Sequence, residues 1–158
     1  MKKRLLLFLS ISILFAEPNW EKARMETVDL LQQYLRINTS NPPGDVRQAA
    51  QWIANIFEKE NISVETFTVP DDNWRMHVLA ELPGMNTELK PLLMLNHLDV
   101  VPVDEDFWDE KPFDGELRNG IVYGRGAIDM KGMGIMELMA LLALHREGWR
   151  PERTIKFL

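Results

Sequence analysis

Two short motifs in this sequence place histidine and aspartate where they could bind a metal ion. The first, His97-Leu98-Asp99, directly follows an apolar run at 92–95, and the second is a glycine-rich stretch at 124–132 that contains Asp129. Side chains two residues apart on a strand point to the same side. If the strand ends just before the first motif, its histidine and aspartate emerge at the edge where open α/β sheets bind ligands. We therefore predict that the two motifs form half of a metal site.

The composition restricts the chemistry of that site and the class of partner. The chain has 158 residues, a hydrophobic fraction of 46% and a formal net charge of -6. This hydrophobic fraction supports a folded core, and the acidic balance disfavours nucleic acid as a partner. Cysteine is absent from the sequence, which excludes disulfides, thiolate metal sites and a cysteine nucleophile. Any metal must therefore bind through nitrogen and oxygen atoms.

Alternating helices and strands are predicted to position the two motifs. Apolar residues recur at helical spacing in some segments and alternate with polar residues in others. The run at 92–95 is continuously apolar, as expected for a strand buried on both faces of a parallel sheet. The pattern predicts a three-layer α/β fold, in which a mostly parallel sheet is flanked by helices. We expect helices at 20–37, 47–60 and 133–146, and strands at 62–69, 76–82, 92–95 and 154–158.

Two details refine this prediction. Asn119-Gly120 lies between short strand-like runs and predicts a β-hairpin between the motifs, because both central residues of such a turn need positive φ. The helix at 133–146 is apolar on nearly every side, so we expect it to be buried. Its methionines Met133, Met136 and Met139 are accordingly predicted to lie in the core.

Residues 1–16 have the layout of a secretory signal peptide. A basic start at Lys2-Lys3-Arg4 is followed by an apolar stretch and then by Ala16, which suits the position before a cleavage site. The apolar stretch is shorter than the roughly 20 residues that span a membrane. We expect an exported protein, periplasmic or secreted. An uncleaved N-terminal membrane anchor and a cytoplasmic protein with an apolar first helix are the alternatives.

From about Met25 onwards, the sequence resembles the M20 family of zinc peptidases and deacylases, which includes aminoacylase, acetylornithine deacetylase, succinyl-diaminopimelate desuccinylase and carboxypeptidases. The order and spacing of the motifs make the resemblance specific. It implies that residues 17–158 are the N-terminal part of a zinc-dependent catalytic domain, truncated before the lid domain and the C-terminal half. The sequence also stops inside a predicted core strand, so we expect a fragment. The matching parts are the turn at 38–44, the motif at 97–102, the loop at 108–115 and the stretch at 123–132.

The resemblance assigns a role to each candidate site residue. In M20 proteins the equivalent of His97 binds one zinc ion, the equivalent of Asp129 bridges two, and the equivalent of Asp99 is the catalytic-site aspartate that orients the histidine. Imidazole and carboxylate suit zinc, and a carboxylate that accepts the second ring N–H fixes the tautomer. The resemblance implies two zinc ions per complete domain, with Co2+ as a substitute, and a cis peptide at Asp129-Met130. The paired glutamates, one of them the general base, would follow Leu158.

These features predict a zinc-dependent hydrolase of amide bonds in short peptides or N-acyl amino acids, with metal-activated water as the nucleophile. The implied lid domain would offer the surface for a homodimer. The 158-residue fragment is predicted to be inactive alone, because the general base and several ligands are missing from it. The sequence does not determine the acyl group of the substrate, the preferred side chain of its amino acid or the number of metal ions. A non-catalytic scaffold or binding protein that retains the M20 fold is the alternative.

Each motif also has a structural interpretation. A His-x-Asp pair at a strand end can be an ordinary hydrogen bond. The stretch Gly124-Arg125-Gly126 can be a tight turn or a phosphate cradle, although it lacks the Gly-Lys-Ser/Thr ending of a P-loop. For the other residues we expect structural roles for His77 and His145, pocket lining or hairpin packing for Trp108 and Phe113, and a solvated or supporting charge at Lys131.

Overall fold

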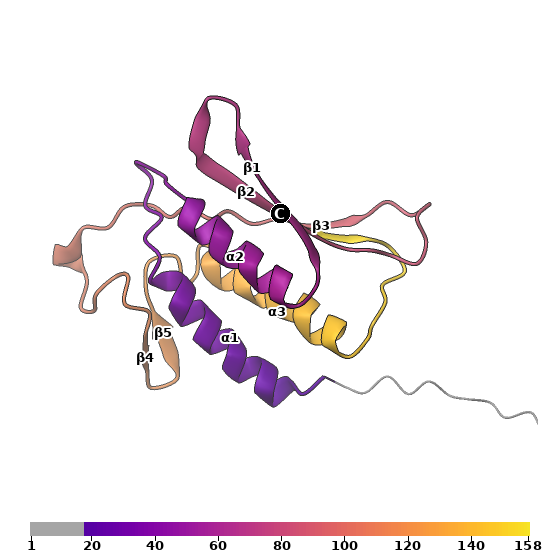
Figure 1. The fold of residues 1–158 in the computed structure, drawn as a ribbon. Helices are drawn as coiled ribbons and strands as arrows, with labels where there is room; N and C mark the ends of the chain where they lie inside the picture. Colours follow the sequence, from indigo (N-terminus) through magenta and orange to yellow (C-terminus); the bar gives the residue numbers. More distant parts are fainter. Residues whose placement is uncertain (1–17) are drawn as a thin grey trace, which may run out of the picture.

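The larger sheet of the described structure has four strands (Figure 1). The first two strands pair antiparallel, the second strand pairs antiparallel with the last, and the last strand pairs parallel with the third. Of the two motifs predicted to bind a metal, the first follows the third strand and the second runs into the start of the last helix. In spatial order the strands are β1 (Ser63–Val69), β2 (Asp72–Leu82), β6 (Ile155–Phe157) and β3 (Leu92–Met94).

The structure is a computed structural model that describes residues 18–158. The signal peptide or anchor predicted at 1–16 lies outside the described residues. In the described part, none of the helices combines the length and the apolar character needed to cross a membrane.

The predicted α/β class is confirmed, but the sheet in residues 18–158 is mixed rather than mostly parallel. β1 and β2 are joined by a tight turn in which Asp71 has a φ of 66°, and strands with so short a connection must run antiparallel. β2 therefore enters the sheet against the direction of β6 as well. One of the three strand pairs is parallel, namely β3 with β6.

Three helices cover one face of the sheet (Figure 1). The buried side chains of the strands, such as Ala80, Leu82 and Phe157, share one hydrophobic core with side chains from all three helices. The opposite face carries an ion pair between Glu81 and Lys156, with Oε2 and Nζ 2.9 Å apart. The second helical layer of the predicted three-layer fold is therefore not present in residues 18–158. The helices are α1 (Trp20–Leu35), α2 (Arg47–Lys59) and α3 (Lys131–Arg146).

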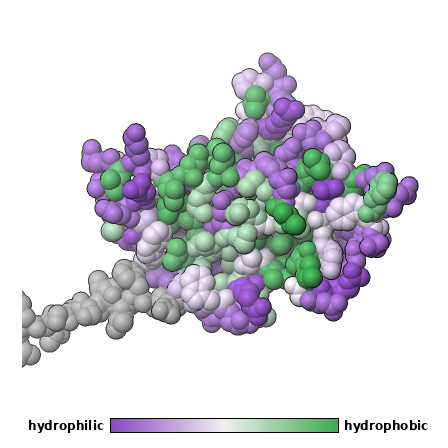
Figure 2. Space-filling view, turned by 180° about the vertical axis from the view of Figure 1, so that it is seen from behind, coloured by the Kyte–Doolittle hydropathy of each residue, from purple (hydrophilic) through white to green (hydrophobic). Residues whose placement is uncertain are grey.

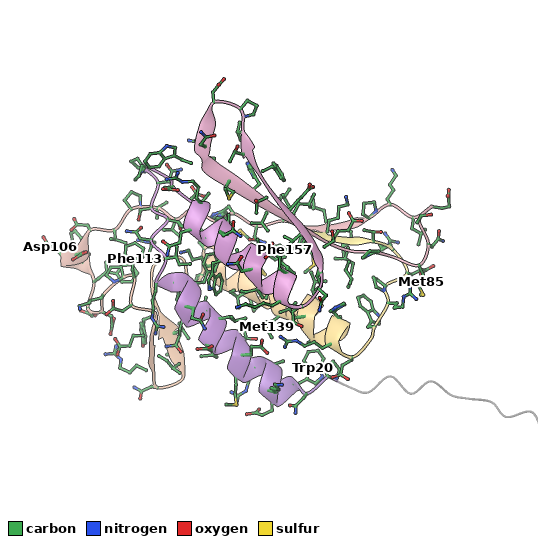
Figure 3. The ribbon with its side chains drawn as sticks, in the orientation of Figure 1. Trp20, Met85, Asp106, Phe113, Met139 and Phe157 are labelled. Atoms are coloured by element: carbon green, nitrogen blue, oxygen red, sulfur yellow. The ribbon has the colours of Figure 1, made fainter. Side chains whose placement is uncertain are left out.

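Local signals explain where the helices begin and end. The side chain of Asn19 accepts a hydrogen bond from the backbone N–H of Lys22 at 2.9 Å, which caps the start of α1. Gly148, with a φ of 74°, follows the end of α3 and adopts the left-handed conformation typical of a helix stop. Met139 of α3 and Phe157 of β6 point into the core between helices and sheet (Figure 3).

Two burial predictions are wrong. Leu92 and Leu93 of β3 are each 50% exposed, because β3 is the edge strand and nothing in the described part of the chain covers it. On α3, Met133 and Met136 are 45% and 55% exposed, whereas Met139 is buried. An apolar run shows that a segment can be buried, but it does not show which of its sides another element will cover.

The predicted hairpin is present, built from β4 (Glu116–Arg118) and β5 (Ile121–Tyr123). Asn119 and Gly120 have φ values of 53° and 80°, so both residues of the turn are left-handed, as the sequence pattern requires. The hairpin lies beside the end of α1 (Figure 1), where the side chain of Gln32 donates to the carbonyl of Gly115 at 2.8 Å. A 3-10 turn, Glu105–Phe107, lies in the loop before it, with Asp106 at the outer end (Figure 3).

Candidate metal centre

His97 and Asp129 meet in space although 32 residues separate them in the sequence. Nε2 of the imidazole lies 3.0 Å from Oδ1 of the carboxylate. The two side chains are 48% and 81% exposed, so the pair opens to solvent. The fold thus brings the two motifs together on an accessible surface.

Asp99 holds the other side of the imidazole ring. Nδ1 of His97 lies 2.9 Å from the backbone carbonyl oxygen of Asp99 and 3.3 Å from Oδ1 of its carboxylate. Both oxygens are acceptors, so a proton on Nδ1 can be donated to them. The sequence assigned this role to the carboxylate, whereas the backbone oxygen is the nearer acceptor and the carboxylate is the second one.

A loop, rather than a strand, delivers these residues. β3 ends at Met94, and residues 95–99 have no regular secondary structure. Side-chain alternation along a strand therefore does not place His97 beside Asp99. Backbone hydrogen bonds hold the loop instead, with Asn96 N–H donating to the carbonyl of Leu158 at 2.9 Å.

Gly126 allows the second motif to approach the first. Its φ is 89°, and a Cβ atom at this position would lie 2.6 Å from Cγ1 of Val100, far inside contact distance. Only glycine combines this backbone conformation with so close an approach. The peptide bond between Asp129 and Met130 is cis. α3 begins at the next residue, Lys131, so Asp129 projects from the loop just before a helix.

The glycine-rich stretch behaves as a tight turn. The N–H of Arg125 donates to the carbonyl of Pro112 at 2.7 Å, and that of Ala127 donates to the carbonyl of Gly124 at 3.1 Å. Backbone N–H groups engaged in this way are not available to cradle a phosphate. The guanidinium of Arg125 lies 5.2 Å above the ring of Trp108, which supports the packing role for that tryptophan.

The donor atoms of His97 and Asp129 fit a metal cation. A neutral imidazole has one N–H; when that proton is on Nδ1, beside the oxygens of Asp99, Nε2 and the Asp129 oxygen face each other as two acceptors 3.0 Å apart. A cation that binds both lone pairs removes this repulsion, and imidazole nitrogen with carboxylate oxygen is a usual zinc ligand set. Within residues 18–158, however, no three His, Asp or Glu side chains converge on one such position. The described residues thus supply two ligands.

Lys131 is buried, so the solvated alternative is wrong and its contacts are those of a supporting charge. Its Nζ donates to the backbone carbonyls of Tyr34 at 3.1 Å and Ile37 at 2.6 Å, and it lies 4.5 Å from the centre of the Tyr34 ring. Burial lowers the pKa of the Lys131 amine to about 8. The residue joins the start of α3 to the end of α1. The sequence offered no signal for this contact, because the two carbonyls belong to residues more than ninety positions away.

Residues 39–41, which lie in the turn expected at 38–44, also contact the site. The hydroxyl of Thr39 donates to the carbonyl of Leu98 at 2.7 Å, and the Asn41 amide donates to Oδ2 of Asp99 at 3.0 Å. Thr39 is 1% exposed. Neither the burial of Thr39 nor the partner of its hydroxyl could be identified without the fold.

A cavity of about 430 Å³ borders the site. His97 and Asp99 line one side, and Arg75 and His77 of β2 line another. The ring of His77 also stacks on Phe67, with ring centres 5.1 Å apart, which agrees with the structural role expected for it. Trp108 and Phe113 do not line this cavity. The other expected structural histidine, His145, has Nε2 3.1 Å from the carbonyl oxygen of Glu60.

Comparison with known sequences places the site within a matched region. The family model described as peptidase family M20/M25/M40 matches residues 93–158, which contain both His97 and Asp129. Aminoacylase-1 from Sus scrofa is 36% identical over 132 residues, which cover 82% of this chain and 31% of that protein. The chain therefore spans about a third of the length of the curated relatives that it matches.

Solved structures show the same fold. An M20 family metallo-carboxypeptidase, Sso-CP2 from Sulfolobus solfataricus, superimposes with a TM-score of 0.73 at 25% identity, covering 84% of this chain and 30% of that one. Human carnosine dipeptidase 1 superimposes with a TM-score of 0.72 at 24% identity, covering 87% of this chain and 32% of that one. The second likeness is evidence for the fold alone.

Proposed function

Because this chain belongs to peptidase family M20/M25/M40, we propose that it supplies part of the metal centre of a zinc-dependent amide hydrolase. The observation that carries the proposal is the 3.0 Å approach of His97 Nε2 to Asp129 Oδ1, with the other ring nitrogen already bonded to Asp99. When the proton of a neutral imidazole is on Nδ1, a nitrogen lone pair and a carboxylate oxygen face the same solvent-accessible position.

Each of the three residues has a separate task in this proposal. His97 and Asp129 would hold the metal, and Asp99 keeps the proton on Nδ1 of His97 so that Nε2 retains its lone pair. Bound zinc lowers the pKa of a water molecule to roughly 7 and polarises the carbonyl of an amide. Asp129 is exposed, so its second oxygen is free for a second ion.

We propose short peptides and N-acyl amino acids as the substrate class. The names of the relatives support this class, since they include an aminoacylase, a carboxypeptidase and a dipeptidase. The cavity of about 430 Å³ beside His97 is of the size that small-molecule sites commonly have. It has polar side chains, among them Arg75 and Asn96, within a largely apolar lining.

Substitution of the two ligands in the full-length protein tests the proposal. His97→Ala and Asp129→Ala should each lower zinc content and reduce hydrolysis of an N-acyl amino acid by more than about a hundredfold, because each removes a bond to the metal. Zinc is measured by atomic absorption after dialysis, and hydrolysis by release of the free amino acid. Asp106→Ala, which removes an exposed carboxylate from the outer loop, is the matched control.

The outcomes separate the hydrolase from its alternative. If both ligand variants keep the zinc content and the activity of the unmodified protein, the metal centre is assigned to the wrong residues. If the unmodified protein binds zinc at these residues but hydrolyses no amide, the non-catalytic scaffold is the better description.

A further inference from the structure

The side chain of Asn41 binds the carboxylate that faces His97. Its amide nitrogen Nδ2 donates to Oδ2 of Asp99 at 3.0 Å, while Oδ1 of the same carboxylate lies 3.3 Å from Nδ1 of His97. We propose that Asn41 is a positioning residue, which holds the Asp99 carboxylate against the imidazole and thereby keeps Nε2 of His97 aimed at the metal position. This inference rests on the proposed function.

The orientation of Asp99 depends on this contact. A carboxylate on a single Cβ–Cγ bond can rotate, and its orientation is set by the groups that donate to it. The Asn41 amide donates to Oδ2 of Asp99, and Oδ1 of the same carboxylate lies 3.3 Å from Nδ1 of His97. Among the described residues, no other side chain donates a hydrogen bond to this carboxylate. Removing the amide would therefore leave the imidazole as its one side-chain donor in this part of the chain.

The backbone around Asn41 is fixed to the same loop as Asp99. Ser40 and Val100 form a parallel bridge, in which Val100 N–H donates to the carbonyl of Thr39 at 3.1 Å and Asn41 N–H donates to the carbonyl of Val100 at 2.9 Å. The Thr39 hydroxyl adds a bond of 2.7 Å to the carbonyl of Leu98. Asn41 and Asp99 thus lie on two segments that are hydrogen-bonded to each other at Leu98 and at Val100, on both sides of Asp99.

Gly44 closes the turn that orients the Asn41 side chain. Its N–H donates to the carbonyl of Ser40 at 2.8 Å, and its φ is 76°. A Cβ atom at this position would lie 3.0 Å from Cγ of Asn41, so the amide would have to shift by a few tenths of an ångström. The glycine therefore leaves room for the rotamer that reaches Asp99. Gly44 therefore supports the hydrogen bond from Asn41 to Asp99 through the Asn41 side chain, without contacting Asp99 or His97 itself.

The test compares Asn41→Asp and Asn41→Ala with Asn55→Asp in the full-length protein. Asn41→Asp keeps the size of the side chain but replaces the donor with an acceptor, and Asn41→Ala removes both. Asn55 is an exposed asparagine on α2 that accepts a hydrogen bond from Gln51, so Asn55→Asp makes the same chemical change away from the site. Thermal unfolding of each metal-free variant checks that the fold is kept.

Two measurements read out the position of the imidazole. Zinc affinity, measured by competition with a chromophoric chelator, should fall by about tenfold or more in both Asn41 variants and stay unchanged in Asn55→Asp. In the metal-free protein, the 15N chemical shifts of His97 should report the Nδ1–H tautomer, and both Asn41 variants should move them towards a tautomer mixture. A substitution that only perturbs the structure far from the site should change neither the zinc affinity nor the His97 chemical shifts.

The possible failures are distinguishable. If the unmodified protein binds zinc through His97 and both Asn41 variants retain its affinity and its His97 chemical shifts, this inference is overturned and the proposed function stands. If the unmodified protein binds no zinc, the proposed function falls, and this inference falls with it.

Discussion

Lys131 shows how a single buried cation can join two distant parts of the fold. Its amine is bonded to two carbonyls at the end of α1, Tyr34 and Ile37, and its side chain is 1% exposed. The amine gives the carbonyl of Ile37 a partner and adds a second donor to that of Tyr34, which already accepts from the N–H of Ile37 at 3.1 Å. Because Lys131 lies two residues after Asp129, it also anchors the loop that presents that carboxylate.

Lys131→Ala should lower the free energy of unfolding by about 2–4 kcal/mol, because it removes two hydrogen bonds and leaves a cavity in the core. Lys131→Met keeps most of the side-chain volume but has no hydrogen-bond donor, so it should lower the free energy of unfolding by less. Urea denaturation followed by tryptophan fluorescence measures both changes. Lys90→Ala, at an exposed lysine, is the control and should match the unmodified protein. Equal stability of Lys131→Ala and Lys90→Ala would show that the buried amine does not stabilise the fold.

At the scale of the elements, one arginine connects all three helices. Arg146 near the end of α3 donates to Glu26 of α1 at 2.7 and 2.9 Å, and to Glu60, the residue that caps α2, at 3.0 Å. Hydrogen bonds from Arg146 hold the pKa values of both carboxyl groups below their ordinary value of 4.5. The packing of α1 against α3 thus includes a charged contact at the end remote from the metal centre.

Arg146→Met should make the protein less stable at neutral pH and less sensitive to acid. A lowered carboxyl pKa stabilises the folded state above the ordinary value of 4.5, and this contribution is lost as the pH falls through the lowered pKa values of Glu26 and Glu60. For these partly exposed pairs we expect a loss of about 1–2 kcal/mol at pH 7 and a smaller loss at pH 3.

Denaturation at both pH values provides the measurement, and Arg24→Met is the matched control. Arg24 pairs with Glu21 on the exposed side of α1, so its loss should leave stability unchanged. An equal loss for Arg146→Met at pH 7 and pH 3 would argue against a contribution from the ionised carboxylates.

At the scale of the whole molecule, apolar side chains are left at the surface. Seen from behind, the structure presents a broad area of apolar side chains (Figure 2). The exposed side chains include Leu93 and Leu95 at the edge strand β3 and Met133 and Met136 on α3, which are between 45% and 62% exposed. The outer edge of β3 has no neighbouring strand in residues 18–158. An unpaired edge beside apolar side chains is a surface on which proteins associate.

The 158-residue chain on its own should therefore self-associate as its concentration rises. Static light scattering over a concentration series would measure the mass. Leu93→Lys should reduce the association, because a charge on an edge strand opposes strand pairing. Leu117→Lys is the control, since Leu117 is similarly exposed, at 47%, but lies on the separate β4–β5 hairpin. A constant monomeric mass for the unmodified chain would disprove the expectation.

Most helices and strands could be predicted from the sequence because their signals are local. Apolar periodicity located α1 and α2 to within two residues of their ends, and Asn119-Gly120 located the hairpin turn. The direction of β2 and the exposure of β3 could not be predicted in this way. Both depend on which element lies next to the strand, and a single strand's pattern does not contain that information.

For the site, the sequence by itself determined which atoms are present: an imidazole at position 97, carboxylates at 99 and 129, no thiolate, and a glycine at 126. Only the tertiary structure decided how they meet. The acceptors of the His97 proton, the burial of Lys131 and the bond from Asn41 to Asp99 all join residues through the packing of separate loops. The type of a side chain limits the bonds it can form, whereas its partner is selected by a fold that brings distant segments within 3 Å of each other.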